Sequence, residues 1–302
     1  MRRSTRWPSS SAPTADGAFN AGFSLVTTVS VLLLVSLGLA VVFGLRRVIN
    51  LAHGEFIMFG AFATLTATRA GVGLWGAMLV AVAVTAAFGL VVELTLIRHL
   101  YERPADTMLA TWGLSLILVQ LADLVYGSVT EGIPTPLASF GVGDYSMSEY
   151  NLVLIGVAWT LAALTWLVTR RTRYGLLTRA AAQNPDMAAG LGVNTRRVAT
   201  WTFAYGAGLA GAAGAVLAPV VGVIPTMGQL YVARSFMAVI VGGPAFLAGT
   251  VGASSALGAV ENLVSRSYTP VIGQAMLLVA AIVILRFLPQ GLTGRRRRGG
   301  LI

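Results

Sequence analysis

The sequence RRVINLAHGEF, residues 46–56, places charged and polar side chains between two long apolar runs. Asn50, His53 and Glu55 in this stretch can donate and accept hydrogen bonds, which suits a small neutral polar solute. A helix interrupted here would expose backbone N–H or C=O groups, and membranes tolerate these groups only where protein or a water-filled cavity satisfies them. The stretch therefore predicts a broken helix near residues 46–69, of the kind that forms substrate sites in transporters.

These residues could instead have structural roles. His53 could be a helix-end histidine bonded to backbone, and Glu55 could cap the second half of the broken helix at its positive end. Thr111 and Trp112, in a later uncharged run, are further candidates for the path. Arg234 lies in a short apolar segment, so its charge either faces protein or water or reaches to the membrane interface.

The ionisable residues exclude several kinds of chemistry. All 21 basic residues are arginine, so the Walker A lysine that grips nucleotide phosphates cannot exist in this chain. Cysteine is absent, and two histidines, His53 and His99, are too few to suggest a metal centre. The carboxylates form no pair at catalytic spacing. We therefore expect a protein that is not an enzyme and that binds no metal or cofactor itself.

Membrane helices must position these residues. The chain has 302 residues, 56% of them apolar and 11% charged, and a mean hydropathy of +0.78, which is outside the range of soluble globular domains. The sequence predicts an all-α polytopic transmembrane helical bundle of about eight to ten spans. Uncharged stretches that meet or approach the length of a span cover residues 17–45, 70–92, 150–169, 198–233 and 267–285.

Charge patterning predicts the ends of the chain and its orientation. Residues 1–16 are polar and rich in Ser and Pro, which predicts a disordered tail, while residues 17–294 form the transmembrane domain and residues 295–302 a basic tail. The loop at 170–197 is rich in arginine, whereas the loop at 126–150 carries acids and no base. The positive-inside bias places the arginine-rich loop and the C-terminus in the cytoplasm. The net charge of +10 has the same origin, so nucleic acid is not an expected partner.

Because Val198 and Arg295 are both predicted on the cytoplasmic side, the chain between them must cross the membrane an even number of times. We predict four crossings, with GGPA (242–245) as a turn on the cytoplasmic side. At the start of the chain two arrangements remain open. In the first, residues 56–68 make a short crossing and the N-terminal tail lies outside the cell. In the second, residues 46–69 enter and leave the membrane on the same face. The four predicted crossings cover residues 199–218, 226–241, 246–264 and 270–287.

The arginine-rich segment 173–203 predicts two short amphipathic helices on the membrane surface. Pro185 interrupts or restarts the first helix, and Gly192 can terminate the second. A compact knob of small residues suits docking into a groove on a partner protein. A solvated connector would have a similar composition.

Several separate motifs together resemble one family, the permease subunits of branched-chain amino acid ABC importers. Within this family, part of the sequence is most similar to the urea-type branch, whose importers carry urea or short amides. One departure is Pro244, where the family usually has a Pro-free junction. The motifs are GLRRVINLAHGEFIMFGAF (44–62), LATWGLSLIL (109–118), MAAGLGVNTRRVATWTF (187–203), AGLAGAAGAVLAP and PQGL (289–292).

The resemblance implies a multi-pass subunit of a bacterial plasma membrane importer. It implies as partners a second permease subunit, either a copy of itself or a sister, two ATPase subunits that bind ATP and Mg, a periplasmic or extracellular solute-binding protein, and membrane lipid. The cargo expected from the branch is urea or a short amide; the alternatives are a branched-chain amino acid or, in another class, a stand-alone carrier or channel. The resemblance further implies a cytoplasmic loop that couples to the ATPase through Ala182, Asn184, Met187, Ala188, Leu191 and Gly192.

Overall fold

The computed structural model describes residues 15–46, 49–101, 103–135, 137–142 and 145–294, and nearly all of them are helical, which confirms the predicted class. The exception is a short antiparallel pair of strands in which Ser139 lies opposite Ser148. The elements in chain order are α1 (Ala15–Arg46), α2 (His53–Arg69), α3 (Leu74–Thr95), the 3-10 helix η1 (Ile97–His99), α4 (Pro104–Tyr126), β1 (Ser139–Val142), β2 (Tyr145–Ser148), α5 (Glu149–Arg171), α6 (Arg173–Gln183), α7 (Pro185–Gly190), α8 (Thr195–Val221), α9 (Met227–Gly242), α10 (Phe246–Ser267) and α11 (Pro270–Phe287).

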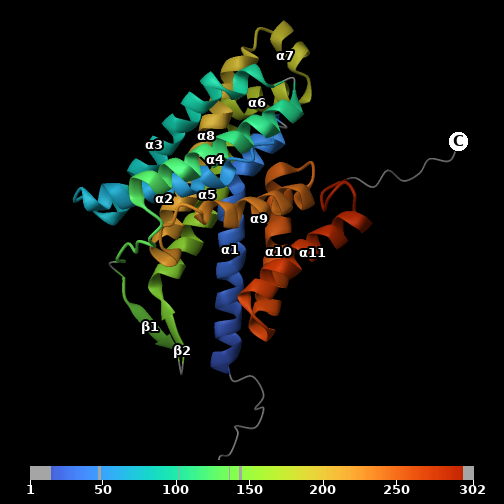
Figure 1. Cartoon of the computed structure of the whole chain (residues 1–302). Coiled ribbons are helices and arrows are strands. Elements are labelled where there is room, and N and C mark those ends of the chain that lie inside the picture. The colour runs from blue at the N-terminus through green and yellow to red at the C-terminus, as the bar shows by residue number, and fades with distance from the viewer. Residues whose placement is uncertain (1–14, 47–48, 102, 136, 143–144, 295–302) are drawn as a thin grey trace, which may run out of the picture.

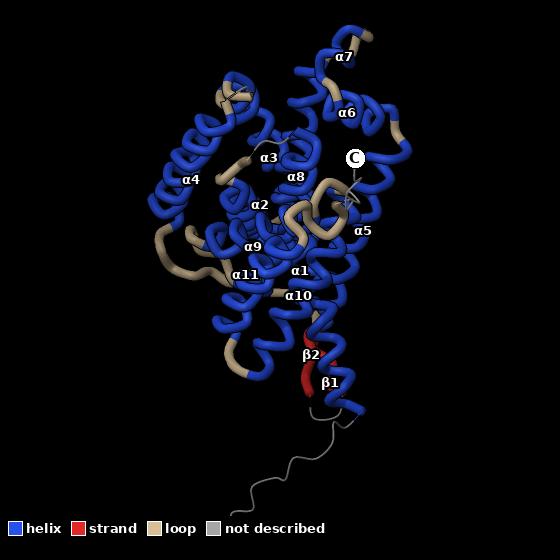
Figure 2. Tube along the Cα trace, turned by 90° about the vertical axis from the view of Figure 1, so that its right-hand side faces the viewer, coloured by secondary structure: helices blue, strands red, loops and turns tan. Residues whose placement is uncertain are grey.

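The bundle has two distinct ends. Helices α6 and α7 project at one end, and the β1–β2 pair lies at the opposite end, where α1 begins (Figures 1 and 2). Arg69 pairs with Glu131, and Glu131 forms a backbone bridge with Val223, so the end of α2 and the end of α8 lie close together. The arginine-rich and acidic loops are therefore on opposite ends, as the charge pattern predicts. Because α1 runs from the strand end to the α6–α7 end, the arrangement with a short α2 crossing fits the structure.

Six helices are long and apolar enough to cross a membrane, and the count rises to seven if α9 and α10 form one bent span. This is below the expected eight to ten, because α2 has 17 residues and α9 only 16. The turn between α9 and α10 bends the pair by 116°, so it is a broken span or re-entrant loop. The predicted segments 226–241 and 246–264, with a turn at 242–245 between them, nearly coincide with α9 and α10, although α9, with 16 residues, is too short to make a full crossing alone. The six candidate spans are α1, α3 together with η1, α4, α5, α8 and α11.

Helix α8 forms the centre of the bundle because its glycines let other backbones approach. Gly206 faces Gly38 of α1, and a Cβ on Gly206 would lie 2.9 Å from the carbonyl oxygen of Gly38. Gly211 packs against Gly60 of α2, and Gly214 lies against the same helix. Small residues allow this close approach in membrane helices, where packing replaces the hydrophobic effect as the driving force.

The predicted broken helix is confirmed. Helix α1 ends at Arg46 and α2 begins at His53, and residues 49–52 between them are coil and turn. Arg47, one of the charged residues of this stretch, lies outside the described residues. The N-terminus of α2 meets the N-terminus of α9, because Gly54 and Gly228 are in backbone contact. Two short helices thus begin at the same place inside the bundle.

The predicted tails fall mostly outside the described part of the chain. Of the segment 1–16, residues 1–14 lie outside it, while Ala15 and Asp16 belong to the first turn of α1. The basic tail at 295–302 also lies outside it. The residues just before this tail are held in place, because Leu292 N–H donates to the Val241 carbonyl at 2.7 Å.

Candidate solute-binding site

The side chains of the break satisfy its backbone groups. Asn50 is buried, and its Oδ1 accepts a hydrogen bond from the N–H of Ala52 at 3.0 Å. The N–H of Leu51, in the break, donates to Thr111 Oγ1 of α4 at 3.1 Å, although the two residues are 60 positions apart in the chain. Thr111 in turn donates to the carbonyl of Thr107 at 2.9 Å. These contacts explain why a membrane bundle tolerates irregular backbone at this depth.

His53 lies behind this junction and reaches α1. Its Nε2 is 2.9 Å from the carbonyl oxygen of Val35, and Ser235 of α9 donates to the same oxygen at 3.1 Å. The ring is almost fully buried. The structure thus gives His53 a backbone partner, in line with the helix-end alternative, and ties α1, α2 and α9 together at one atom.

Glu55 and Trp112 lie in opposite surroundings. Glu55 is buried in the first turn of α2, where a carboxylate is stabilised by the positive end of the helix, and Ser115 of α4 is its side-chain partner. Its Oε2 has no hydrogen-bond partner among the described residues. Trp112 is 55% exposed on α4. The structure therefore brings Asn50, Thr111 and Glu55 to the junction but leaves Trp112 apart from it.

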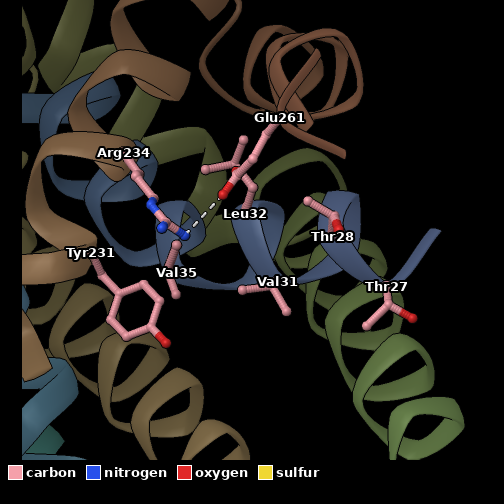
Figure 3. Close-up of a pocket in the computed structure, with 8 residues that line it drawn as sticks. All are labelled: Thr27, Thr28, Val31, Leu32, Val35, Tyr231, Arg234 and Glu261. Atoms are coloured by element: carbon pink, nitrogen blue, oxygen red, sulfur yellow. Dashed lines mark ion pairs between the residues drawn. The ribbon is translucent and has the colours of Figure 1, made fainter. Parts of the chain in front are cut away.

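A cavity of about 180 Å³ lies beside the junction, between α1, α9 and α10 (Figure 3). Val35, whose carbonyl binds His53, is part of its wall, so one residue of α1 contacts both the cavity and the start of α2. Its lining combines aliphatic, hydroxyl and charged side chains, namely Thr27, Thr28, Val31, Leu32, Val35, Tyr231, Arg234 and Glu261.

An ion pair between Arg234 of α9 and Glu261 of α10 borders this cavity (Figure 3). Arg234 Nη1 lies 3.3 Å from Glu261 Oε1, and the two side chains are only 16% and 10% exposed. The guanidinium carbon is 5.9 Å from the ring centroid of Tyr231. The Arg234 side chain therefore ends on a carboxylate of the same chain at the wall of this cavity. Sequence analysis missed Glu261 as its partner; two opposite charges within apolar segments were the available signal.

Helices α6 and α7 confirm the expected pair of short helices, and their details explain the shape. Asn184 caps α7, since its Oδ1 accepts from Met187 N–H at 2.9 Å, and Pro185 occupies the first turn. Gly192 ends the element with a φ of 84°, which a residue with a side chain rarely adopts. Met187 and Leu191 are 63% and 80% exposed.

Two of the predicted coupling residues are less accessible to a partner than Met187 and Leu191. Ala188 is buried against Ala181 and Val198, and Ala182 is partly buried. Asn184 and Gly192 are exposed, but the structure shows them shaping the α7 turn. Met187 and Leu191 are therefore the large apolar side chains that this turn exposes.

Fold and site together define a polytopic helical membrane protein with a broken-helix junction, an adjoining amphiphilic cavity and a projecting helical knob. Residues 22–288 match the family described as branched-chain amino acid transport system / permease component. The chain belongs to this family, whose characterised members are transport permease subunits and not enzymes.

Curated relatives align along nearly the whole chain. The high-affinity branched-chain amino acid transport system permease protein LivH of Escherichia coli (strain K12) is 30% identical and covers 90% of this chain and 94% of its own. LivH of Salmonella typhimurium is 28% identical with the same coverage. BraD, the corresponding permease protein of Pseudomonas aeruginosa, is 30% identical and covers 89% of this chain and 94% of its own.

Proposed function

We propose that this chain is a transmembrane subunit of an ATP-driven importer of branched-chain amino acids in a bacterial plasma membrane. The observation that carries the coupling role is the α6–α7 knob, on which Met187 and Leu191 are exposed while Ala188 anchors the turn from inside. A rigid knob with apolar side chains at its tip can enter a groove on a partner and transmit a rigid-body movement to the spans.

The partners of the complex follow from this role. A second permease subunit, identical or related, would complete the pathway, two ATPase subunits would bind ATP and Mg, and a solute-binding protein would deliver the cargo. The chain itself would need no cofactor. The positive-inside bias assigns the α6–α7 end, with Arg170, Arg171, Arg196 and Arg197, to the cytoplasm, together with the C-terminus.

The proposed cargo is a branched-chain amino acid, which the sequence motifs give as the alternative to urea. The relatives aligned above are named for branched-chain amino acids, and the urea-type branch has no comparable support. The ion pair between Arg234 and Glu261 beside the cavity agrees with this choice, because an uncharged cargo such as urea needs no ionic partners.

The proposal is tested in liposomes that contain the complete complex with its binding protein. We expect uptake of L-leucine that requires both the ATPase subunits and ATP, with little uptake of urea. Met187→Glu should abolish leucine uptake because a carboxylate at the tip of α7 opposes docking in an apolar groove, and Met187→Leu should retain it. Leucine uptake by the chain without ATPase subunits would identify a stand-alone carrier, and ATP-dependent uptake of urea alone would identify a urea permease.

A further inference from the structure

The cavity between α1, α9 and α10 places charged and aliphatic side chains next to one another. Arg234 and Glu261 form an ion pair at its wall, and Val31, Leu32 and Val35 of α1 provide aliphatic side chains beside that pair (Figure 3). An α-amino acid with a branched aliphatic side chain has the same division, with both charges on one carbon and an apolar group beside it. The volume of about 180 Å³ is several times the roughly 30 Å³ that one water molecule occupies in the liquid.

We infer that this cavity is the cargo-binding site within the permease and that Arg234 binds the carboxylate and Glu261 the ammonium group of a zwitterionic aliphatic amino acid. The inference rests on the proposed function and assigns its cargo to particular residues. Guanidinium and carboxylate form paired, charge-assisted hydrogen bonds, which gives Arg234 the correct geometry for the cargo carboxylate. The aliphatic side chain of the cargo lies against Val31, Leu32 and Val35.

Arg234 and Glu261 are each other's charged partners at the wall of the cavity. Both side chains are largely buried, so a change that removes the partner of either one leaves a desolvated charge. A zwitterion offers each of them a new partner of the correct sign at the same time. Urea, a carboxylic acid without an amino group or an amine without a carboxylate replaces at most one partner and leaves the other unpaired. The pair therefore selects cargo by requiring two charges.

Neighbouring side chains support this orientation. Tyr231 is buried with its ring 5.9 Å from the Arg234 guanidinium carbon, which limits the positions of that group. The hydroxyl of Thr27 donates to the Phe23 carbonyl at 2.9 Å, so its lone pairs can accept from an ammonium group at the edge of the cavity. Asn262, next to Glu261, donates to Ser24 at 2.8 Å and holds α10 against α1.

The walls of the cavity are connected to the broken helix. Ser235, the neighbour of Arg234 on α9, donates to the Val35 carbonyl that also binds His53. A movement of α9 relative to α1 therefore has two simultaneous effects. It changes the position of Arg234, and it breaks the hydrogen bond between Ser235 and the Val35 carbonyl. In this arrangement His53 is a positioning residue that acts through Val35, and it does not touch the cargo.

The first test separates a binding role of the pair from a structural one. The double variant Arg234→Gln with Glu261→Gln leaves no unpaired charge, so we expect an assembled complex whose L-leucine uptake falls roughly 10- to 100-fold, the loss expected for charge-assisted hydrogen bonds. The exchange Arg234→Glu with Glu261→Arg retains an ion pair of the same span. Uptake should still be lost, because a reversed L-leucine directs its side chain away from the aliphatic surface. Normal uptake in the exchange variant would overturn the inference.

The second test detects occupancy directly in the complete complex. The chain has no cysteine, so Thr27→Cys introduces a single thiol in this subunit at the cavity. We expect millimolar L-leucine to slow its reaction with a small thiol reagent at least about tenfold, and urea or isovalerate to have no effect. The matched control is Ser128→Cys in the exposed segment just after α4, where leucine should not change the rate.

The outcomes distinguish the cavity from the function on which it rests. If the unsubstituted complex does not import leucine with ATP, the proposed function fails and the assignment fails with it. If that complex imports leucine but Thr27→Cys is equally reactive with and without it, the importer stands and the assignment of this cavity is wrong. Protection by leucine together with loss of uptake in both double variants supports the assignment.

Discussion

His53 and Ser235 bind the same backbone oxygen, that of Val35, at 2.9 and 3.1 Å. The two donors come from α2 and α9, whose N-termini meet at the broken-helix junction, and the acceptor belongs to α1. The carbonyl of Val35 is also part of the i→i+4 ladder of its helix, so the shared contact joins three helices without interrupting α1. The proposed cargo cavity lies on the side of α1 where α9 makes this contact.

Replacing His53 with Ala should destabilise the protein through this shared oxygen. We expect a loss of roughly 1–3 kcal/mol, because a buried hydrogen bond is removed and a space is left where the ring was. Ser235→Ala should cost less, about 0.5–1.5 kcal/mol, since it removes one hydroxyl. Thermal unfolding of the purified subunit measures both. A double variant whose loss equals the sum of the single losses would show that the two donors are not coupled through Val35.

The contact between Gly54 and Gly228 should not tolerate a methyl group. In Gly54→Ala the added carbon would overlap the backbone of Gly228, and overpacking of this kind costs about 1–3 kcal/mol or more. We expect low yield of folded protein by size-exclusion chromatography. Gly113→Ala in α4 is the control, because nothing lies within 4 Å of the position of its Cβ and alanine favours helix. Equal yields for the two variants would contradict the close approach of α2 and α9.

Thr111 should stabilise the break between α1 and α2. Thr111→Val keeps the shape of the side chain but removes the acceptor for the Leu51 N–H, so we expect a loss of about 1–3 kcal/mol from an unsatisfied buried donor. Thr95→Val is the matched control, since Thr95 is exposed and bonds only to the Val91 carbonyl of its own helix. Hydrogen exchange at Leu51 should accelerate in the first variant and stay unchanged in the control. No change at Leu51 would refute the capping role of Thr111.

Asn184 should control the order of the α7 turn. Asn184→Ala removes the acceptor for the Met187 N–H and should cost the helix start about 0.5–2 kcal/mol. Asn184→Asp keeps an acceptor at the same position and should preserve the turn. We expect faster proteolysis within residues 184–192 and weaker coupling of ATP hydrolysis to uptake for the alanine variant alone. Unchanged proteolysis in that variant would show that the cap does not hold α7.

Some of the site could be predicted from the sequence because its signals are local. Pro185, Asn184 and Gly192 determine the start and end of α7 through their own backbone preferences, and the structure agrees with the expected pair of short helices. The break before His53 was visible because polar residues interrupt an apolar run. The burial of Ala188 was not visible, because its neighbours Ala181 and Val198 are selected by the packing of α6 and α8.

The sequence by itself determined the class of the protein, the positions of most helices and the placement of the arginine-rich and acidic loops at opposite ends, because hydropathy, helix boundaries and charge bias depend on residues near one another in the chain. Tertiary structure alone decided that Arg234 meets Glu261, that His53 and Ser235 share the Val35 carbonyl and that α9 stops short of a full crossing. The two contacts join segments that are distant in the chain, and no local preference encodes which face of one helix meets which face of another.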